Sequence, residues 1–208
     1  MTNSDSKSKQ IAEGLLGIKA VFLRPNDPFT WASGIKSPIY CDNRLTLTAP
    51  EVRDVIEHEM ARVIEEKYPE CDVVMGTSPA GIAHAAISAH ILGKPMGYVR
   101  SSSKTHGRNN RIEGKLEVGE KVVVVEDLIS TGGSSIEVVE ALREAGAEVL
   151  GVISIFTYET AKADKNFEAA GVEKLSLCTI SELMETAVAE EYVTSEEGKG
   201  IIEWLREI

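Results

Sequence analysis

The segment from residue 122 to residue 135 reads Val-Val-Val-Val-Glu-Asp-Leu-Ile-Ser-Thr-Gly-Gly-Ser-Ser. Four consecutive valines are typical of a strand buried on both faces, as the strands of a parallel sheet are. We predict a strand at residues 121–126, which ends in the two carboxylates of Glu126 and Asp127. The residues rich in Ser, Thr and Gly that follow predict a tight turn that opens a helix.

Strands and helices alternate along the sequence on both sides of this segment. Apolar spacing predicts helices at residues 50–68, 80–92 and 136–146, and β-rich runs predict strands at 72–75, 95–100, 148–156 and 172–179. Two capping boxes, Thr179 with Glu182 and Thr194 with Glu197, predict two helices at the end. This order predicts an α/β fold with a mostly parallel central sheet flanked by helices.

The 208 residues are predicted to form a single domain. Residues from about 50 to 180 are expected to form its core, and residues from about 1 to 48, with the C-terminal helices, are expected to form a small cap (hood). Hydrophobic residues make up 43% of the chain and aromatic residues only 5%, so the core must rest on Val, Ile, Leu and Ala.

The composition excludes several classes of partner. A net charge of -11 repels nucleic acids and anionic membranes, and no apolar run is long enough to span a bilayer.

The three cysteines form no C-x-x-C pair, which indicates reduced thiols in a cytoplasmic protein. Residues 1–10 are polar and unlike a signal peptide. His58, His84 and His90 have no acid or cysteine at metal-ligand spacing, so we expect structural or surface roles and no metal ligands.

The turn after the valine strand has the composition of a phosphate site. Ligands of open α/β sheets collect at the carboxyl ends of the strands. Backbone N–H groups at the helix start, with the hydroxyls of Ser130, Thr131 and Ser134, can hold a phosphate, and Gly132 and Gly133 allow its close approach. The adjoining carboxylates suit the hydroxyls of a ribose 5-phosphate. The segment lacks a Walker A lysine and a G-x-G-x-x-G pattern, but an ordinary helix cap beside two surface acids remains an alternative.

A basic stretch precedes this strand. Between residues 100 and 115 there is one acid, Glu113, and five basic residues: Arg100, Lys104, Arg108, Arg111 and Lys115. Residues 101–114 are polar without periodicity, so we expect a long loop. Such a cationic loop is suited to closing over pyrophosphate, although a solvated surface loop remains the alternative.

Four segments carry a resemblance to a known family. Residues 126–134 resemble the motif by which type I phosphoribosyltransferases bind 5-phosphoribosyl 1-pyrophosphate (PRPP). Arg100, Lys104 and the pair His106-Gly107 resemble the mobile catalytic loop of orotate phosphoribosyltransferases. Residues 29–38 resemble that family's Phe-Thr-x-x-Ser-Gly-x-Lys-Ser-Pro signature near the orotate pocket, and residues 75–81 resemble its pyrophosphate loop.

The resemblance implies a type I phosphoribosyltransferase fold and the transfer of ribose 5-phosphate from PRPP to N1 of orotate, with Mg²⁺ as the cofactor. It implies a homodimer in which the basic loop reaches the neighbouring site. The catalytic residues it implies are Lys104, His106 and Asp127, and Ser130 would bind orotate. The residues implied to bind PRPP are Arg100, Lys104, His106, Glu126, Asp127, Leu128, Ile129, Ser130, Thr131, Gly132, Gly133 and Ser134.

The chain departs from the family at several places where some members carry a basic residue. Ser101, Ser102, Ala32 and Ala80 replace lysines of some members, and Tyr158 lies where an arginine is often found. Two other functions are weighed against the orotate reaction. A purine or uracil phosphoribosyltransferase would share the PRPP motif but not the loop, and a PRPP-sensing regulator would bind without turnover and usually carries a nucleic-acid-binding face.

Overall fold

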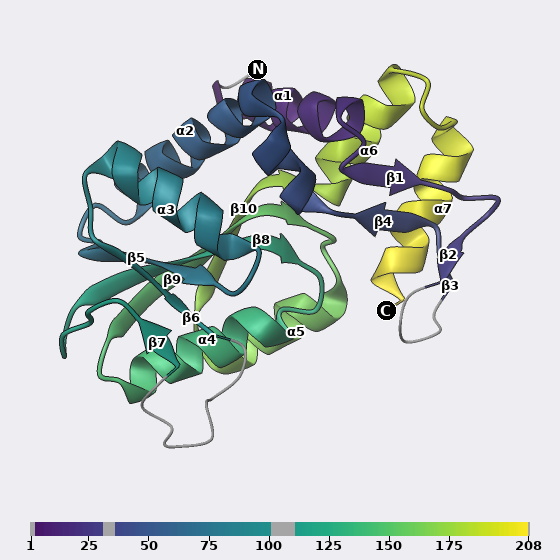
Figure 1. The fold of residues 1–208 in the computed structure, drawn as a ribbon. Helices are drawn as coiled ribbons and strands as arrows, with labels where there is room; N and C mark the ends of the chain where they lie inside the picture. The colour runs from purple at the N-terminus through teal and green to yellow at the C-terminus, as the bar shows by residue number, and fades with distance from the viewer. Residues whose placement is uncertain (1–2, 31–35, 101–110, 208) are drawn as a thin grey trace.

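The computed structural model describes residues 3–30, 36–100 and 111–207. A six-stranded sheet in the order β10-β9-β8-β5-β6-β7 forms its centre (Figure 1). The five strands that pair in parallel are β5 (Val73–Thr77), β6 (Met96–Val99), β8 (Lys121–Ile129), β9 (Glu148–Thr157) and β10 (Glu173–Thr179). The short edge strand β7 (Ile112–Glu113) pairs antiparallel with β6. The prediction of a mostly parallel sheet is therefore confirmed.

Helices cover both faces of the sheet, as the valine run requires. Val123 and Val125 pack with α2 (Pro50–Lys67) and α3 (Gly81–Leu92) on one face. Val122 and Val124 alternate to the other face and pack with α4 (Gly133–Glu144) and α5 (Ala161–Ala170). Figure 1 shows these two layers on opposite sides of the sheet.

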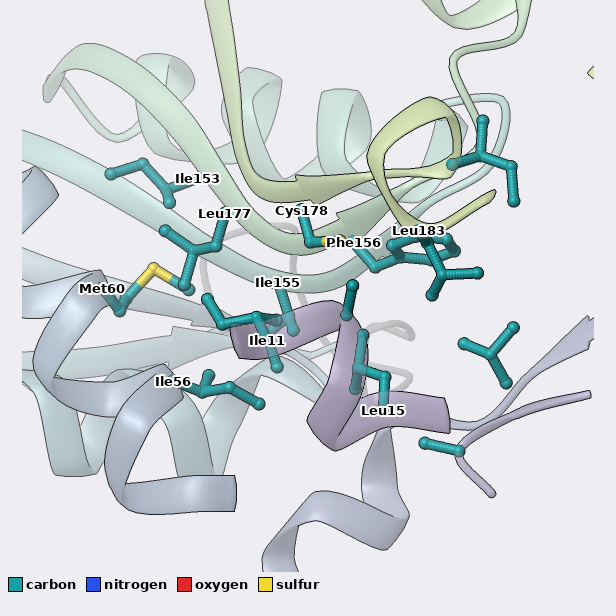
Figure 2. Close-up of a cluster of buried hydrophobic side chains, with 14 of the residues drawn as sticks. Ile11, Leu15, Ile56, Met60, Ile153, Ile155, Phe156, Leu177, Cys178 and Leu183 are labelled. Carbon is teal, nitrogen blue, oxygen red and sulfur yellow. The ribbon is translucent and has the colours of Figure 1, made fainter. Parts of the chain in front are cut away.

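The larger cluster of buried side chains joins the terminal helices to the sheet. Figure 2 shows Ile11 and Leu15 of α1 (Asn3–Gly17) meeting side chains of α2, β9, β10 and α6 (Ile180–Ala189). Buried residues of α7 (Ser195–Arg206) belong to the same cluster. Both predicted capping boxes are present, at Thr179 with Glu182 and at Thr194 with Glu197.

Short strands of the N-terminal region lie beside α7 (Figure 1). They form two small antiparallel sheets, β1 with β4 and β2 with β3. Their bounds are Val21–Leu23 for β1, Phe29–Thr30 for β2, Lys36–Ser37 for β3 and Ile39–Cys41 for β4, and the 3-10 helix η1 (Asn43–Thr48) leads into α2. These strands, with α1, α6 and α7, make up the part of the chain for which a cap is predicted. In the described ranges, no helix is long and apolar enough to cross a membrane.

Two boundaries differ from the sequence prediction, and two helices are additional. The strand predicted to end at Glu126 continues to Ile129, because the ladder with β9 goes on through Leu128 opposite Phe156 and Ile129 opposite Thr157. The end of the predicted long loop is instead strand β7, held by pairing with β6. The helices α1 and α5 were not predicted.

Candidate active site

The predicted phosphate turn lies between the end of β8 and the start of α4. Gly132 is the N-cap of α4 and has a φ of 79°, a left-handed conformation that favours glycine. The N–H of Ile136 donates to the Gly132 carbonyl at 3.0 Å, which closes the first turn of the helix. The N–H groups of that first turn point out of the helix start, where an anion is favoured.

Side chains of α5 and of its N-cap residue donate hydrogen bonds to carbonyl groups of the turn. The Thr160 hydroxyl donates to the Ser130 carbonyl at 2.6 Å, and the Asn166 amide donates to the Thr131 carbonyl at 2.9 Å. A Cβ atom added at Gly132 would lie 2.5 Å from the buried ring of Phe167, whereas one added at Gly133 meets nothing within 4 Å. The turn is thus packed on one side by α5 and open on the other. Sequence reasoning missed this support from α5.

Glu126 lies inside β8 with its carboxylate turned into the protein, only 5% exposed. One oxygen accepts hydrogen bonds from the Thr77 hydroxyl at 2.5 Å and from the Asp127 N–H at 3.1 Å. The other accepts from the hydroxyls of Ser135 at 3.0 Å and Ser134 at 3.5 Å. Burial, and then the neighbouring Asp127 carboxylate, raise the pKa of Glu126 to about 7.

This pKa predicts a pH dependence of stability. Between the ordinary value of 4.5 and about 7 the folded chain keeps a proton on Glu126 that the unfolded chain has released. The free energy of unfolding should therefore fall as pH rises through that window. Denaturant titrations at several pH values should show that the free energy of unfolding falls less steeply with pH in Glu126→Gln than in the wild type. Glu140→Gln, at an exposed position of α4, should show the same pH dependence as the wild type. Parallel pH profiles for the wild type and Glu126→Gln would contradict the assignment.

Asp127 is the more accessible of the two acids, since its side chain is only partly buried. Its carbonyl accepts a hydrogen bond from the Asn43 amide at 2.7 Å, and Asn43 is itself 1% exposed. The Cys41 thiol donates to Asn43 at 3.3 Å. These hydrogen bonds connect the end of β4 and the start of η1 to the end of β8. The role of Asn43 was not predicted from the sequence.

The turn after β5 lies beside the phosphate turn. Ser78 and Pro79 are joined by a cis peptide bond, and the Ser78 N–H donates to the Val99 carbonyl at 3.2 Å. A side chain at Gly81 would collide with the Val125 carbonyl and the Thr77 hydroxyl, so glycine allows α3 to begin directly against β8. The structure thus places the predicted pyrophosphate loop next to the predicted phosphate turn.

The ends of the basic stretch are held together at the edge of the sheet. The Arg100 N–H donates to the Arg111 carbonyl at 2.8 Å, and the Arg111 guanidinium donates back to the Arg100 carbonyl at 3.0 Å. Arg100 also pairs with Glu113 at 3.2 Å. Several residues named from the sequence lie outside the described ranges: Ala32, Ser101, Ser102, Lys104, His106 and Arg108.

The remaining predicted residues divide between the core and the surface. Ile129 is fully buried and Leu128 packs against the core, so only their backbones remain for a ligand. Tyr158 is 4% exposed and stacks edge-on with Phe156. His84 is buried against Glu57 at 2.5 Å, whereas His58 and His90 are exposed, which confirms structural and surface roles.

A cavity of about 640 Å³ lies between residues 25–38 and α7 rather than at the end of β8. Pro28, Lys36 and Trp204 are among the residues that line it. Lys36 and Pro38 of the predicted signature at residues 29–38 line it, whereas Glu126, Asp127 and the turn at residues 130–134 do not.

Known proteins resemble the chain over almost its whole length. A family model described as a phosphoribosyl transferase domain matches residues 45–191. The orotate phosphoribosyltransferase of Listeria monocytogenes (strain F2365) is 57% identical over 201 residues, 97% of this chain and 96% of that protein. The crystal structure of the Aeropyrum pernix orotate phosphoribosyltransferase is 30% identical with a TM-score of 0.75 and covers 84% of this chain and 96% of its own. A Mycobacterium tuberculosis orotate phosphoribosyltransferase in complex with PRPP is 25% identical with a TM-score of 0.65, covering 85% and 98%.

Proposed function

This chain belongs to the phosphoribosyltransferase family, as one of its orotate phosphoribosyltransferases, and we propose here which residues carry the reaction. The enzyme transfers ribose 5-phosphate from PRPP to N1 of orotate and releases orotidine 5'-monophosphate and pyrophosphate, a step of pyrimidine biosynthesis. The identity of 57% to the Listeria enzyme over nearly the full length carries this conclusion. It favours orotate over a purine or uracil substrate, and turnover over a purely regulatory role.

The 5-phosphate of PRPP binds at the start of α4 in this proposal. Backbone N–H groups from Thr131 to Ser134 receive it, and Leu128 and Ile129 contribute only through their backbones. Support comes from the open side of Gly133 and from the α5 contacts that fix the turn. Asp127 accepts hydrogen bonds from the ribose hydroxyls, since its carboxylate is partly accessible at the end of β8. Glu126 was predicted to share this ribose contact, which remains a prediction.

Mg²⁺ is the proposed cofactor, held chiefly by oxygens of PRPP. Within the described ranges, no group of three or more His, Cys, Asp or Glu residues could hold a metal. Mg²⁺ usually binds substrate phosphates and keeps several waters, so the ion can enter the site together with PRPP. When bound, Mg²⁺ neutralises part of the charge of the pyrophosphate group.

The basic loop acts on the departing pyrophosphate. Arg100, Lys104 and His106 offset the negative charge that grows as the bond to the anomeric carbon breaks. N1 of orotate then forms the new bond to that carbon. Orotate is already anionic, so no strong general base is required, and Ser130 at the turn positions it.

The active form is proposed to be a homodimer that shares the basic loop between subunits, in the cytoplasm. Free thiols at Cys41, Cys71 and Cys178 suit a reducing compartment. A shared loop places Lys104 of one subunit and Asp127 of the other in the same active site.

Mixed dimers test this arrangement. Asp127→Asn alone should lower turnover by about 10–100-fold, because a charge-assisted hydrogen bond contributes about 1.5–3 kcal/mol. If Asp127→Asn and Lys104→Ala subunits exchange at random, half of the dimers are mixed, and each mixed dimer has one intact site. The mixture should recover about a quarter of wild-type activity. Activity no higher than that of the separate variants would contradict a shared loop.

A further inference from the structure

The ends of β5 and β8 lie side by side. The turn after β8 binds the 5-phosphate in the proposed function, and the resemblance implies that the turn after β5, within residues 75–81, binds pyrophosphate. The two strands pair in parallel, with Gly76 opposite Val125, so Thr77 and Glu126 are the next residues along. Thr77 leads into the predicted pyrophosphate turn. Ser134 and Ser135 belong to the first turn of α4, where the 5-phosphate is proposed to bind.

One carboxyl group connects the two turns. The Thr77 hydroxyl donates to Oε1 of Glu126 at 2.5 Å, and the Ser135 hydroxyl donates to Oε2 at 3.0 Å. Thr77, Ser135 and Glu126 are 3%, 0% and 5% exposed. These buried bonds leave the partly exposed Asp127 as the acid that faces a ligand.

We propose that Glu126 is a positioning residue that fixes the distance between the pyrophosphate turn and the 5-phosphate turn, so that both ends of one PRPP molecule bind at once. A catalytic constellation must be held within about 0.5 Å of its productive geometry by supporting hydrogen bonds. The Glu126 carboxyl supplies such a support because its two oxygens bind different turns. This inference rests on the proposed function and differs from the predicted ribose contact of Glu126.

The hydroxyl partners of Glu126 provide the test, because neither Thr77 nor Ser135 is accessible to substrate. Thr77→Val and Ser135→Ala should each raise the KM for PRPP about three- to tenfold, as expected for the loss of one buried hydrogen bond. The KM for orotate should stay within about twofold of wild type. Thr77→Ser keeps the hydroxyl and should restore the KM for PRPP.

Ser154→Ala is the matched control. Ser154 lies opposite Glu126 on β9 and is 0% exposed, but its hydroxyl bonds the Phe156 carbonyl and Ser176 instead of Glu126. It should leave the KM for PRPP within about twofold of wild type. Melting temperatures of all variants separate this effect from a general loss of stability. Equal effects of Ser154→Ala and Ser135→Ala would overturn the proposal.

Binding of the two halves of PRPP separates positioning from a direct ribose contact. If Glu126 positions the turns, Glu126→Gln binds ribose 5-phosphate and pyrophosphate individually almost as the wild type does, but binds PRPP more weakly. Adding Ser135→Ala to Glu126→Gln should then weaken PRPP binding little further. Selective loss of ribose 5-phosphate binding, or fully additive effects, would overturn the proposal. Failure of the wild type to bind PRPP would instead refute the proposed function.

Discussion

Lys104→Ala is expected to lower kcat by about 10²–10³-fold, the usual cost of removing one preorganised group that stabilises charge in a transition state. In the proposed function, charge accumulates on the pyrophosphate as its bond to the ribose breaks, and Lys104 offsets this charge where it is greatest. PRPP in the ground state retains its other contacts, so its Kd should rise by less than about tenfold. Single-turnover rates and PRPP binding, measured on the same variant, separate the two effects.

Lys115→Ala is the control for the general charge of the basic stretch. Lys115 ends the same stretch, but its side chain is 86% exposed and pairs with Glu117 at 2.6 Å. Its removal changes the net charge by the same amount and should leave kcat within about twofold of wild type. If Lys104→Ala weakens PRPP binding but leaves kcat nearly unchanged, Lys104 contributes uniform binding instead of transition-state stabilisation.

Gly132→Ala is expected to disrupt both stability and activity. The alanine must adopt a φ near 79°, at a cost of about 1–2 kcal/mol, and its Cβ would lie 2.5 Å from the ring of Phe167. Overpacking of this kind costs about 1–3 kcal/mol more. The turn can relieve the clash by moving away from α5, which displaces the N–H groups at the start of α4. Thermal melts should show a clear loss, and the KM for PRPP should rise.

The neighbouring glycine provides a control for stability. A Cβ at Gly133 meets nothing within 4 Å, and this position does not need a positive φ. Gly133→Ala should therefore keep a melting temperature near that of wild type, whatever its effect on PRPP. Equal melting temperatures for the wild type and Gly132→Ala would show that the turn tolerates a side chain at Gly132 and would contradict the predicted loss of stability.

Local patterns in the sequence predicted most of the sheet and the helices around it. The four valines predicted a two-sided buried strand, and the turn after it predicted the start of α4. Helix α1 was missed because its first residues are polar and its buried Ile11 and Leu15 cover only one face. Helix α5 was missed although Thr160 caps it, since Ala163 and Phe167 are its only fully buried residues within the helix.

The connections within the site depend on contacts between residues far apart in sequence. Thr77 reaches Glu126 across 49 positions, and Asn43 reaches Asp127 across 84. No local spacing records such pairs, so the sequence predicted a ribose contact for both acids, whereas the structure distinguishes a buried Glu126 from a more accessible Asp127. The orotate reaction itself was predicted from the resemblance, and the comparisons confirm it.

Orotate consumption by the purified protein, followed by its ultraviolet absorbance with PRPP and Mg²⁺, tests the central claim most directly. Adenine, hypoxanthine and uracil run in parallel, with pyrophosphate release as the common readout. The account predicts that orotate alone is consumed, with one pyrophosphate released for each orotate, and only when Mg²⁺ is present. Binding of PRPP without turnover of any base, or turnover of another base in preference to orotate, would contradict it.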